Sequence, residues 1–463
     1  MDDLRQMGYR AVDLAVDHME SQPGHRPVPP DVRRLLRDAP LPEAGRPAAT
    51  ILDDVAAHIL PYPMGNSHPR FFAWVNSPAA PIGAFADMLA AAMNPACTFG
   101  DHADVYVERC AVRWLSELVG FQGGAGLLTS GGSMASLTCI AAARHRAALA
   151  DGWDMRAVGL QGGHAPMAMY VSEDGHNCLR KAAELLGLGA RAVRVVPLDA
   201  EFRMDVAALR AMLAADRAAG WRPFCVAASA GTTNTGAIDP LHALADLCAA
   251  EGIWLHVDGA YGAFAALDPE VAPHLAALGR ADSLALDPHK WLQVPLECGC
   301  ALVRNGDLLR ATFSMVPPYL RDEEGRPGFD EYGFQQTRGF RALKVWACLQ
   351  QAGRAGMAEM IIRHRRLAQR LADALDAAPD FERAAPVTLS VVCFRYAPPG
   401  LAADAVDRLQ GPIARTVQAG GEAFITTTVL RGRPVLRACI LHRDTTAADV
   451  AALVDVVRRA GRT

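Results

Sequence analysis

The sequence predicts an α/β protein whose large domain contains a mostly parallel central sheet. Between residues 80 and 345, apolar runs short enough for buried strands alternate with longer helical segments, and this alternation is typical of parallel sheets. Several runs are followed by glycine, histidine, aspartate or lysine, which fits the rule that α/β sheets bind ligands at the carboxyl ends of their strands. A chain of 463 residues is long enough for two or three domains.

Composition argues against several classes of protein. The net charge of −4 gives no reason to expect a nucleic acid or an anionic membrane as a partner, and no uninterrupted apolar window of about 18 residues predicts a membrane span. The eleven cysteines are scattered, and the close pair Cys298-Gly299-Cys300 has the spacing of neither a metal site nor a redox motif. The first residues lack the apolar core of a signal peptide. We therefore expect a cytoplasmic protein with reduced thiols and no metal.

A glycine-rich turn follows one of the first strand-like runs. The run ends at Thr129, and Ser130-Gly131-Gly132-Ser133 leads into an apolar helix that continues to about Leu149. Glycine lets a ligand approach the backbone closely, and a helix N-terminus offers unpaired N–H groups to an anion. The turn matches neither a Walker motif nor GxGxxG, so it does not favour a nucleotide. The alternative interpretation is an ordinary turn with Ser133 as the helix cap.

Three further strand-like runs end in polar residues. His176 lies in the loop after the run 169–172, and Thr233 lies in the polar turn after the run 223–230. A third run ends at Asp258, and an aspartate in such apolar surroundings needs a partner, such as a cationic ring nitrogen, to offset its desolvation. A plainer interpretation is that these are cap and turn residues, which are common at strand ends.

The run 283–286 is followed by Asp287-Pro288-His289-Lys290-Trp291. Pro288 cannot donate a ladder hydrogen bond and ends the strand, so His289 and Lys290 lie at its carboxyl end. Burial among apolar neighbours should lower the pKa of Lys290, and a neutral amine is the form that makes a Schiff base with an aldehyde. The alternative is a lysine that extends from the strand end to water, which is the commonest fate of this residue.

The combination of these residues predicts pyridoxal 5′-phosphate (PLP) as the cofactor. The glycine-rich turn would hold the phosphate, and Asp258 would keep the pyridine nitrogen protonated so that the ring withdraws electrons. Lys290, about thirty residues after Asp258, would bind the aldehyde. A histidine at another strand end can lie flat on the ring.

The chain resembles the group II PLP-dependent amino-acid decarboxylases, the family of aromatic-amino-acid, histidine and glutamate decarboxylases. The resemblance covers about residues 55 to 445. It departs from the family at Asp287, where many members have asparagine, and at Gly259, where the family motif has alanine. An acidic Asp287 would repel a phosphate unless its side chain points away or is paired. The matching motifs are residues 68–72, 130–133, 175–176, 230–233, 256–261, 287–291 and 338–344.

This resemblance implies the fold type I architecture of PLP-dependent transferases: a large domain with a mostly parallel central sheet, an N-terminal helical segment and a small C-terminal α/β domain. It also implies a homodimer with the active site at the subunit interface. The segment 1–79, which cannot form a core alone, would be a helical dimerisation segment that wraps the neighbouring subunit. Residues 80–345 would form the large PLP-binding domain and residues 346–463 the small C-terminal domain.

The resemblance further implies a set of catalytic groups and cofactor contacts. Lys290 would carry the cofactor, Asp258 would support its ring nitrogen, and His176 would stack on the ring and assist catalysis. The remaining contacts would be Gly132, Ser133 and His289 to the phosphate, Thr233 near the ring, and Ala260 on the ring face opposite His176.

The implied reaction converts an L-amino acid to the corresponding amine and CO2. Phe72 and Trp74, beside Phe71, indicate an apolar or aromatic substrate pocket, although core packing is an equally good interpretation of such a cluster. Arg70 in the same stretch leaves an acidic amino acid open as the substrate.

A polar, glycine- and proline-rich stretch between Pro317 and Arg338 resembles the family's mobile loop. In the family, a tyrosine of this loop reaches the neighbouring subunit's active site and delivers a proton, whereas relatives with phenylalanine there tend to form an aldehyde. An ungapped alignment places Phe329 at this position, and a three-residue gap places Tyr332 there. We expect Tyr332 to be the proton donor because a phenol carries a transferable proton. With Phe329 in that role, the enzyme would be an aldehyde synthase.

Two other classes of protein remain open at this point. An aminotransferase or a cysteine-desulfurase-like enzyme of the same fold would share the aspartate and the lysine, and a transaminase would convert its cofactor to the pyridoxamine form in every cycle. A structural or binding homologue would take up no PLP, but the intact Lys290 and Asp258 argue against it.

Overall fold

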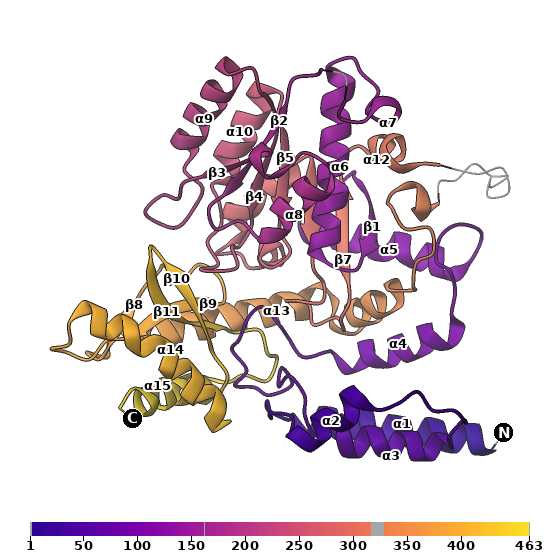
Figure 1. Ribbon diagram of the computed structural model, residues 1–463, viewed down its shortest axis with the longest axis vertical. Helices are drawn as coiled ribbons and strands as arrows, with labels where there is room; N and C mark the ends of the chain where they lie inside the picture. Colours follow the sequence, from indigo (N-terminus) through magenta and orange to yellow (C-terminus); the bar gives the residue numbers. More distant parts are fainter. Residues whose placement is uncertain (1, 162, 316–327, 463) are drawn as a thin grey trace. The chain divides into compact units, whose positions relative to one another are not determined.

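The computed structural model contains two compact units (Figure 1). It describes residues 2–161, 163–315 and 328–462. The larger unit comprises Ala79–Ala368 and Ala385–Val392, and it holds all the strand ends discussed above. The smaller unit comprises Met1–Pro78, Gln369–Ala384 and Cys393–Thr463.

The larger unit is built on a seven-stranded sheet with the strand order β1-β7-β6-β5-β4-β2-β3. The pairs β2–β3, β2–β4, β4–β5 and β5–β6 are parallel, whereas β6–β7 and β7–β1 are antiparallel. The expected α/β fold with a mostly parallel sheet is therefore confirmed. The strands are β1 (Ala125–Thr129), β2 (Met167–Ser172), β3 (Val193–Val196), β4 (Arg222–Ser229), β5 (Trp254–Asp258), β6 (Ser283–Leu286) and β7 (Gly299–Val303).

Helices pack around this sheet, which explains its apolar strands. Every residue of β2, β6 and β7 is buried, as expected for strands covered on both faces. Helix α6 (Gly132–Ala150) lies against β1 and β4 to β7, and its alanines allow this close approach. The other helices are α4 (Pro81–Met93), α5 (Ala103–Leu118), α7 (Met155–Val158), α8 (Asn177–Leu185), α9 (Val206–Ala218), α10 (Leu241–Glu251), α11 (Ala272–Leu275), α12 (Gly306–Phe313) and α13 (Ala342–Asp376), with short 3₁₀ turns at Ala190–Ala192, Ala263–Leu267, Ala276–Arg280 and Phe329–Glu331.

The smaller unit contains a four-stranded sheet with the order β10-β11-β9-β8. Helix α14 packs on β10, β11 and α15, and helix α1 packs on α3. The division of the chain after residues 79 and 345 stays a prediction. The elements are α1 (Asp2–Ser21), α2 (Pro30–Asp38), α3 (Ala48–His58), β8 (Phe381–Arg383), β9 (Val391–Tyr396), α14 (Ala403–Gly420), β10 (Thr426–Leu430), β11 (Arg433–Cys439) and α15 (Ala447–Gly461).

The structure bears on two expectations drawn from composition, which concern membrane spans and disulfide bonds. Among the described residues, no helix combines the length and the apolar character needed to cross a membrane. None of the eleven cysteines, all of which the structure describes, forms a disulfide bond, and all but Cys110 are buried.

Candidate active site

The carboxyl ends of the parallel strands border a cavity of about 310 Å³ in the larger unit. Strand register explains why these ends meet, because Asp258 on β5 pairs with Ser229 on β4 and with Ala285 on β6. The loops that follow β5 and β6 therefore emerge at the same edge of the sheet. All eight residues expected to contact the cofactor line this cavity: Gly132, Ser133, His176, Thr233, Asp258, Ala260, His289 and Lys290.

One wall of the cavity is the turn before α6, and it fits a phosphate group. α6 begins at Gly132 without a side-chain cap, so its first backbone N–H groups are available to a ligand, and the helix dipole favours an anion there. A Cβ atom on Gly132 would lie 2.9 Å from Oδ2 of Asp287 and 3.0 Å from Cβ of Ala260. Any side chain at this position would therefore fill the cradle.

Asp258 and His176 lie together on another side of the cavity. A ring nitrogen of His176 and a carboxylate oxygen of Asp258 lie within 4.8 Å of each other, together with the thiol of Cys178. Oδ1 of Asp258 accepts a 3.1 Å hydrogen bond from the N–H of Ala260. Burial raises the pKa of Asp258 although Lys290 opposes this effect, so its anion would gain from a cationic ring nitrogen.

The orientation of His176 follows from its place at the start of α8. Its Nδ1 accepts a 3.3 Å hydrogen bond from the N–H of Cys178 and so caps the helix. The side chain is otherwise exposed, and its ring borders the cavity. Because Nδ1 is an acceptor, the neutral ring carries its proton on Nε2.

The environment of Lys290 differs from the expectation of a purely apolar site. Its Nζ lies 3.0 Å from Oδ2 of Asp287, whose side chain is only 4% exposed. Burial lowers the pKa of Lys290, but the carboxylates of Asp287 and Asp258 outweigh burial and raise the pKa overall. Without a cofactor the lysine is therefore an ammonium, and the expected neutral amine is wrong for this state.

A buried hydrogen-bond network supports β5 and β6 beneath the cavity. His256 bonds Oγ of Ser283 at 2.9 Å and Oγ of Ser136 at 3.3 Å, and Nε1 of Trp254 donates to Ser283 at 2.8 Å. Burial lowers the pKa of His256 to about 3, so its ring is neutral at physiological pH. The network joins α6 to the strands that present Asp258 and Lys290. The sequence analysis missed it, although His256 lies two residues before Asp258 and so faces the same side of β5.

Aromatic contacts fix the two loops after these strands. The rings of Tyr261 and Trp291 stack with centroids 5.1 Å apart. The hydroxyl of Tyr261 bonds Oγ of Ser390 at 2.6 Å, and Nε1 of Trp291 donates to Nδ1 of His364 at 3.1 Å. Since Tyr261 follows Asp258 and Trp291 follows Lys290, the stack holds both segments in one arrangement.

Phe72 and Trp74, the expected substrate-pocket residues, belong to the smaller unit. Phe72 is buried at 1% exposure, whereas Trp74 is 46% exposed and has a positive φ of 49°. The Trp74 ring lies 5.9 Å from that of Phe71 and 5.7 Å from that of Phe424. These facts describe an aromatic cluster within one unit, and its role in a substrate pocket stays a prediction.

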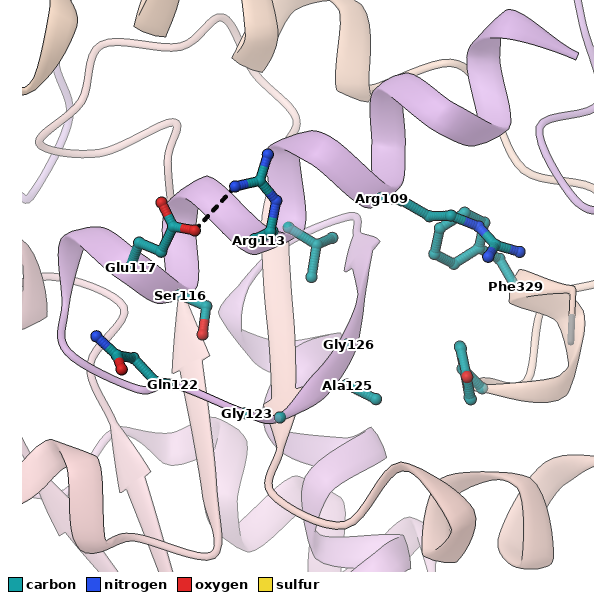
Figure 2. A pocket seen from close by; sticks show the side chains of 12 residues that line it. Arg109, Arg113, Ser116, Glu117, Gln122, Gly123, Ala125, Gly126 and Phe329 are labelled. Carbon is teal, nitrogen blue, oxygen red and sulfur yellow. Dashed lines mark hydrogen bonds and ion pairs between the residues drawn. The ribbon is translucent and has the colours of Figure 1, made fainter. Parts of the chain in front are cut away.

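The two candidates for the loop position line a different cavity, which has a volume of about 590 Å³ (Figure 2). Phe329 and Tyr332 border it together with α5, and no described residue lines both this cavity and the Lys290 cavity. Phe329 is 4% exposed, and the guanidinium of Arg338 lies 5.0 Å from its ring centroid. Tyr332 is half-buried, and burial raises its pKa. Within one copy of the chain, Tyr332 therefore does not border the cavity that holds Lys290.

The base of this loop is anchored by Glu331. Its carboxylate accepts hydrogen bonds from Oγ of Ser314 at 2.8 Å and from Arg310 at 3.1 Å. These contacts join the residues on either side of 316–327. The greater part of the expected polar stretch after Pro317, up to residue 327, lies outside the described residues.

Comparison with known proteins identifies the family. A model of the pyridoxal-dependent decarboxylase conserved domain matches residues 29–397. An aromatic-L-amino-acid decarboxylase of Bacillus atrophaeus is 36% identical over 460 residues, which span 97% of this chain and 93% of the relative. A phenylacetaldehyde synthase of a Rosa hybrid cultivar is 27% identical, with 95% of this chain and 90% of the relative covered.

Solved structures agree with this result. A crystal structure of Oryza sativa TDC with PLP and tryptamine has a TM-score of 0.91 and 27% identity, and it covers all of this chain and 98% of its own. A crystal structure of mouse CSAD has a TM-score of 0.92 and 25% identity, with coverages of 100% and 99%. Because the family model spans most of the sequence and these folds agree along the whole chain, this protein belongs to the pyridoxal-dependent decarboxylase family and is a PLP-dependent amino-acid decarboxylase of fold type I.

Proposed function

We propose that this enzyme decarboxylates an aromatic L-amino acid to its amine and CO2. The observation that carries the proposal is the single cavity that gathers Lys290, Asp258, His176 and the Gly132 turn. The names of relatives support an aromatic substrate, since they include an aromatic-L-amino-acid decarboxylase and tryptophan decarboxylases.

The proposed roles in holding the cofactor follow from charge and position. When bound, PLP supplies an electron sink that stabilises negative charge at the substrate's Cα. Asp258 would hold a proton on the ring nitrogen, and Lys290 would be the residue that anchors the cofactor through its amine. The remaining contacts are the Gly132–Ser133 turn and His289 for the phosphate, His176 and Ala260 for the two faces of the ring, and Thr233 at its edge.

We propose that the enzyme is a homodimer in which Tyr332 protonates Cα in the partner's active site. The separation of the Tyr332 cavity from the Lys290 cavity within one chain supports a role toward a second copy. Phe329 is a poorer candidate because its ring is buried against Arg338. In the same proposal, residues 1–79 are the dimerisation segment, residues 80–345 the cofactor domain and residues 346–463 the small domain.

An acidic substrate is the weaker alternative. Arg70, the residue that left it open, donates a 2.8 Å hydrogen bond from Nε to Asp449. Its positive charge is therefore already paired, and Phe72 and Trp74 are proposed to form an apolar wall of the substrate pocket. We also propose a cytoplasmic location, which the lack of a disulfide bond among the described cysteines supports.

The experiment that tests the function is a substrate screen with the purified, PLP-loaded enzyme. Aromatic L-amino acids, L-glutamate and L-aspartate would be supplied separately, and amine, aldehyde, CO2, peroxide and oxygen uptake would be measured. We expect amine and CO2 in equal amounts from an aromatic substrate, without oxygen uptake. Oxygen consumption equal to CO2 release would instead identify an aldehyde synthase, and turnover of only the acidic amino acids would overturn the proposed substrate class.

A further inference from the structure

The negative charge of the Asp287 carboxylate is balanced by the ammonium of Lys290. The side chain of Asp287 is 4% exposed, and Nζ of Lys290 lies 3.0 Å from its Oδ2. Nε2 of His289 is farther away, at 3.8 Å from the same oxygen. The other oxygen, Oδ1, is buried and has no hydrogen-bond partner among the residues that the structure describes. A buried carboxylate with one unbonded oxygen is poorly stabilised unless a cation lies beside it.

Covalent attachment of the cofactor must disturb this ion pair. An ammonium has no lone pair, so Lys290 has to lose a proton before its nitrogen can bond to an aldehyde carbon, whose oxygen would then leave as water with the two remaining hydrogens of the amine. If that proton left for water, Asp287 would remain as a buried anion without its cation, which is the unfavourable state. If the proton moves from Nζ to Oδ2, a neutral amine and a neutral carboxylic acid result, and neither charge nor atoms enter or leave the site.

We propose that Asp287 is the counter-ion and proton acceptor of Lys290 whenever the lysine is not bonded to the cofactor. The inference rests on the proposed role of Lys290 as the cofactor's anchor. If a neutral substrate amine displaced the lysine, its two hydrogens would pass to Nζ, and the proton on Oδ2 would then return to the released amine and restore the ammonium. A neutral acid at Asp287 also removes a negative charge from beside the Gly132 cradle, where a phosphate is proposed to bind.

The other ionisable groups around Lys290 are less suited than Asp287 to act as its counter-ion and proton acceptor. Asp258 on β5 also attracts the ammonium, but its Oδ1 accepts the backbone N–H of Ala260. His289 lies in the same loop and bonds the carbonyl oxygen of Cys298 through Nδ1 at 2.7 Å. The thiol of Cys178 on α8 is held protonated because burial raises its pKa to about 12. Asp287 is thus a carboxylate in direct contact with Nζ, at 3.0 Å.

The first test measures the basicity of Lys290 in the cofactor-free protein. Competitive labelling with trace acetic anhydride, resolved by peptide mass spectrometry, gives a titration midpoint for each lysine. We expect the wild-type midpoint of Lys290 to lie above the ordinary lysine value of about 10.4. Asp287→Asn keeps the shape but removes the charge, so labelling of Lys290 at about pH 8 should rise by roughly tenfold or more.

A matched control removes another carboxylate from the rim of the same cavity. Glu297 pairs with Arg341 at 2.6 Å, so Glu297→Gln should leave the labelling midpoint of Lys290 where it is. Equal midpoints in the wild type and Asp287→Asn would overturn the proposal. If Asp287→Asn does not fold, a wild-type midpoint at or below the ordinary lysine value would overturn it equally.

The second test detects the transferred proton directly. An infrared difference spectrum between PLP-loaded and cofactor-free wild type should show a new protonated-carboxyl band, and Asp287→Asn should lack it. Absence of the band from the wild type, or its presence in the variant, would overturn the role of proton acceptor. If PLP did not bind the wild type at all, the proposed function would fail, but the labelling of the cofactor-free protein would still decide whether Asp287 is the counter-ion.

Discussion

Arg338 and Glu108 form an ion pair that is almost completely buried, with side-chain exposures of 1% and 0%. Nη1 of Arg338 donates to Glu108 at 3.1 Å and to the carbonyl oxygen of Cys97 at 3.2 Å, and Oε1 of Glu108 accepts the N–H of Leu128 on β1. Since the ring of Phe329 lies against the same guanidinium, this pair joins α5, β1 and the base of the 316–327 stretch.

Removal of one partner should therefore destabilise the protein strongly. Arg338→Met leaves Glu108 as an unpaired buried charge, and we expect a loss of about 3–5 kcal/mol in the free energy of unfolding, measured by urea denaturation. Arg113→Met breaks the exposed α5 pair with Glu117, which has a 2.9 Å contact (Figure 2), and should lower the free energy of unfolding far less, because water screens the pair. Equal losses in the two variants would contradict the assigned importance of the buried pair.

Lys290→Ala should abolish covalent attachment of the cofactor. Borohydride reduction followed by peptide mass spectrometry should find PLP on the 290 peptide of the wild type and on no peptide of the variant. Lys181→Ala, an exposed position on α8, serves as the control and should retain the modification at Lys290. A reduced adduct at another lysine in Lys290→Ala would identify a different anchor.

Asp258→Ala should lower the turnover number by about two orders of magnitude or more, because the ring nitrogen loses its counter-charge. The enzyme should be assayed at saturating PLP with occupancy checked by absorbance, so that lost catalysis is separated from lost binding. Turnover close to that of the wild type with the cofactor bound would show that another group supports the ring nitrogen.

Tyr332→Phe should reduce amine formation and divert carbon flow to the aldehyde, because phenylalanine carries no transferable proton. Oxygen uptake and peroxide would be measured along with both products. Phe329→Leu is the comparison, since it alters the neighbouring buried ring without removing a hydroxyl. If Tyr332→Phe kept the amine as its product, Tyr332 would not be the proton donor.

The buried His256 predicts a particular dependence of stability on pH. Its pKa is about 3 in the folded protein and about 6.5 in the unfolded chain, so the unfolded state binds more protons between these values. Stability should therefore fall as the pH drops from 6.5 towards 3, by up to about 1.4 kcal/mol per pH unit from this group. His256→Asn should show a shallower slope in urea midpoints measured over this range. His242→Gln, at an exposed site, should keep the wild-type slope.

The sequence allowed the cofactor cavity to be predicted because its residues follow strand ends. In a parallel sheet, strand ends meet at one edge, so Asp258, Lys290 and the Gly132 turn come together once the strands are recognised. The charge state of Lys290 could not be predicted from the sequence in the same way. It depends on the distance between two side chains three residues apart, and a strand pattern does not predict which way the side chain of Asp287 points between the end of the strand and Pro288.

The aromatic residues show a second limit of the sequence. Phe72 and Trp74 are consistent with a substrate pocket or a local cluster, and only the structure reveals the ring contacts of Trp74 with Phe71 and Phe424. Phe329 and Tyr332 were also ambiguous, because a gap of three residues exchanges them. Both residues border the same cavity, but their burial differs, since Phe329 is 4% exposed beside Arg338 whereas Tyr332 is half-buried.

The close packing around Gly132 limits which amino-acid substitutions this region of the protein can accept during evolution. Three separate segments leave only the volume of a methyl group or less between them, since the added carbon would lie 2.9 Å from Asp287 and 3.0 Å from Ala260. A substitution here could not be accommodated by a local shift of one loop, because Ala260 and Asp287 are tied to neighbouring strands. A substitution of Gly132 would be tolerated only together with substitutions in the other two segments. Position 132 should therefore change far more slowly during evolution than the exposed helices of the same unit.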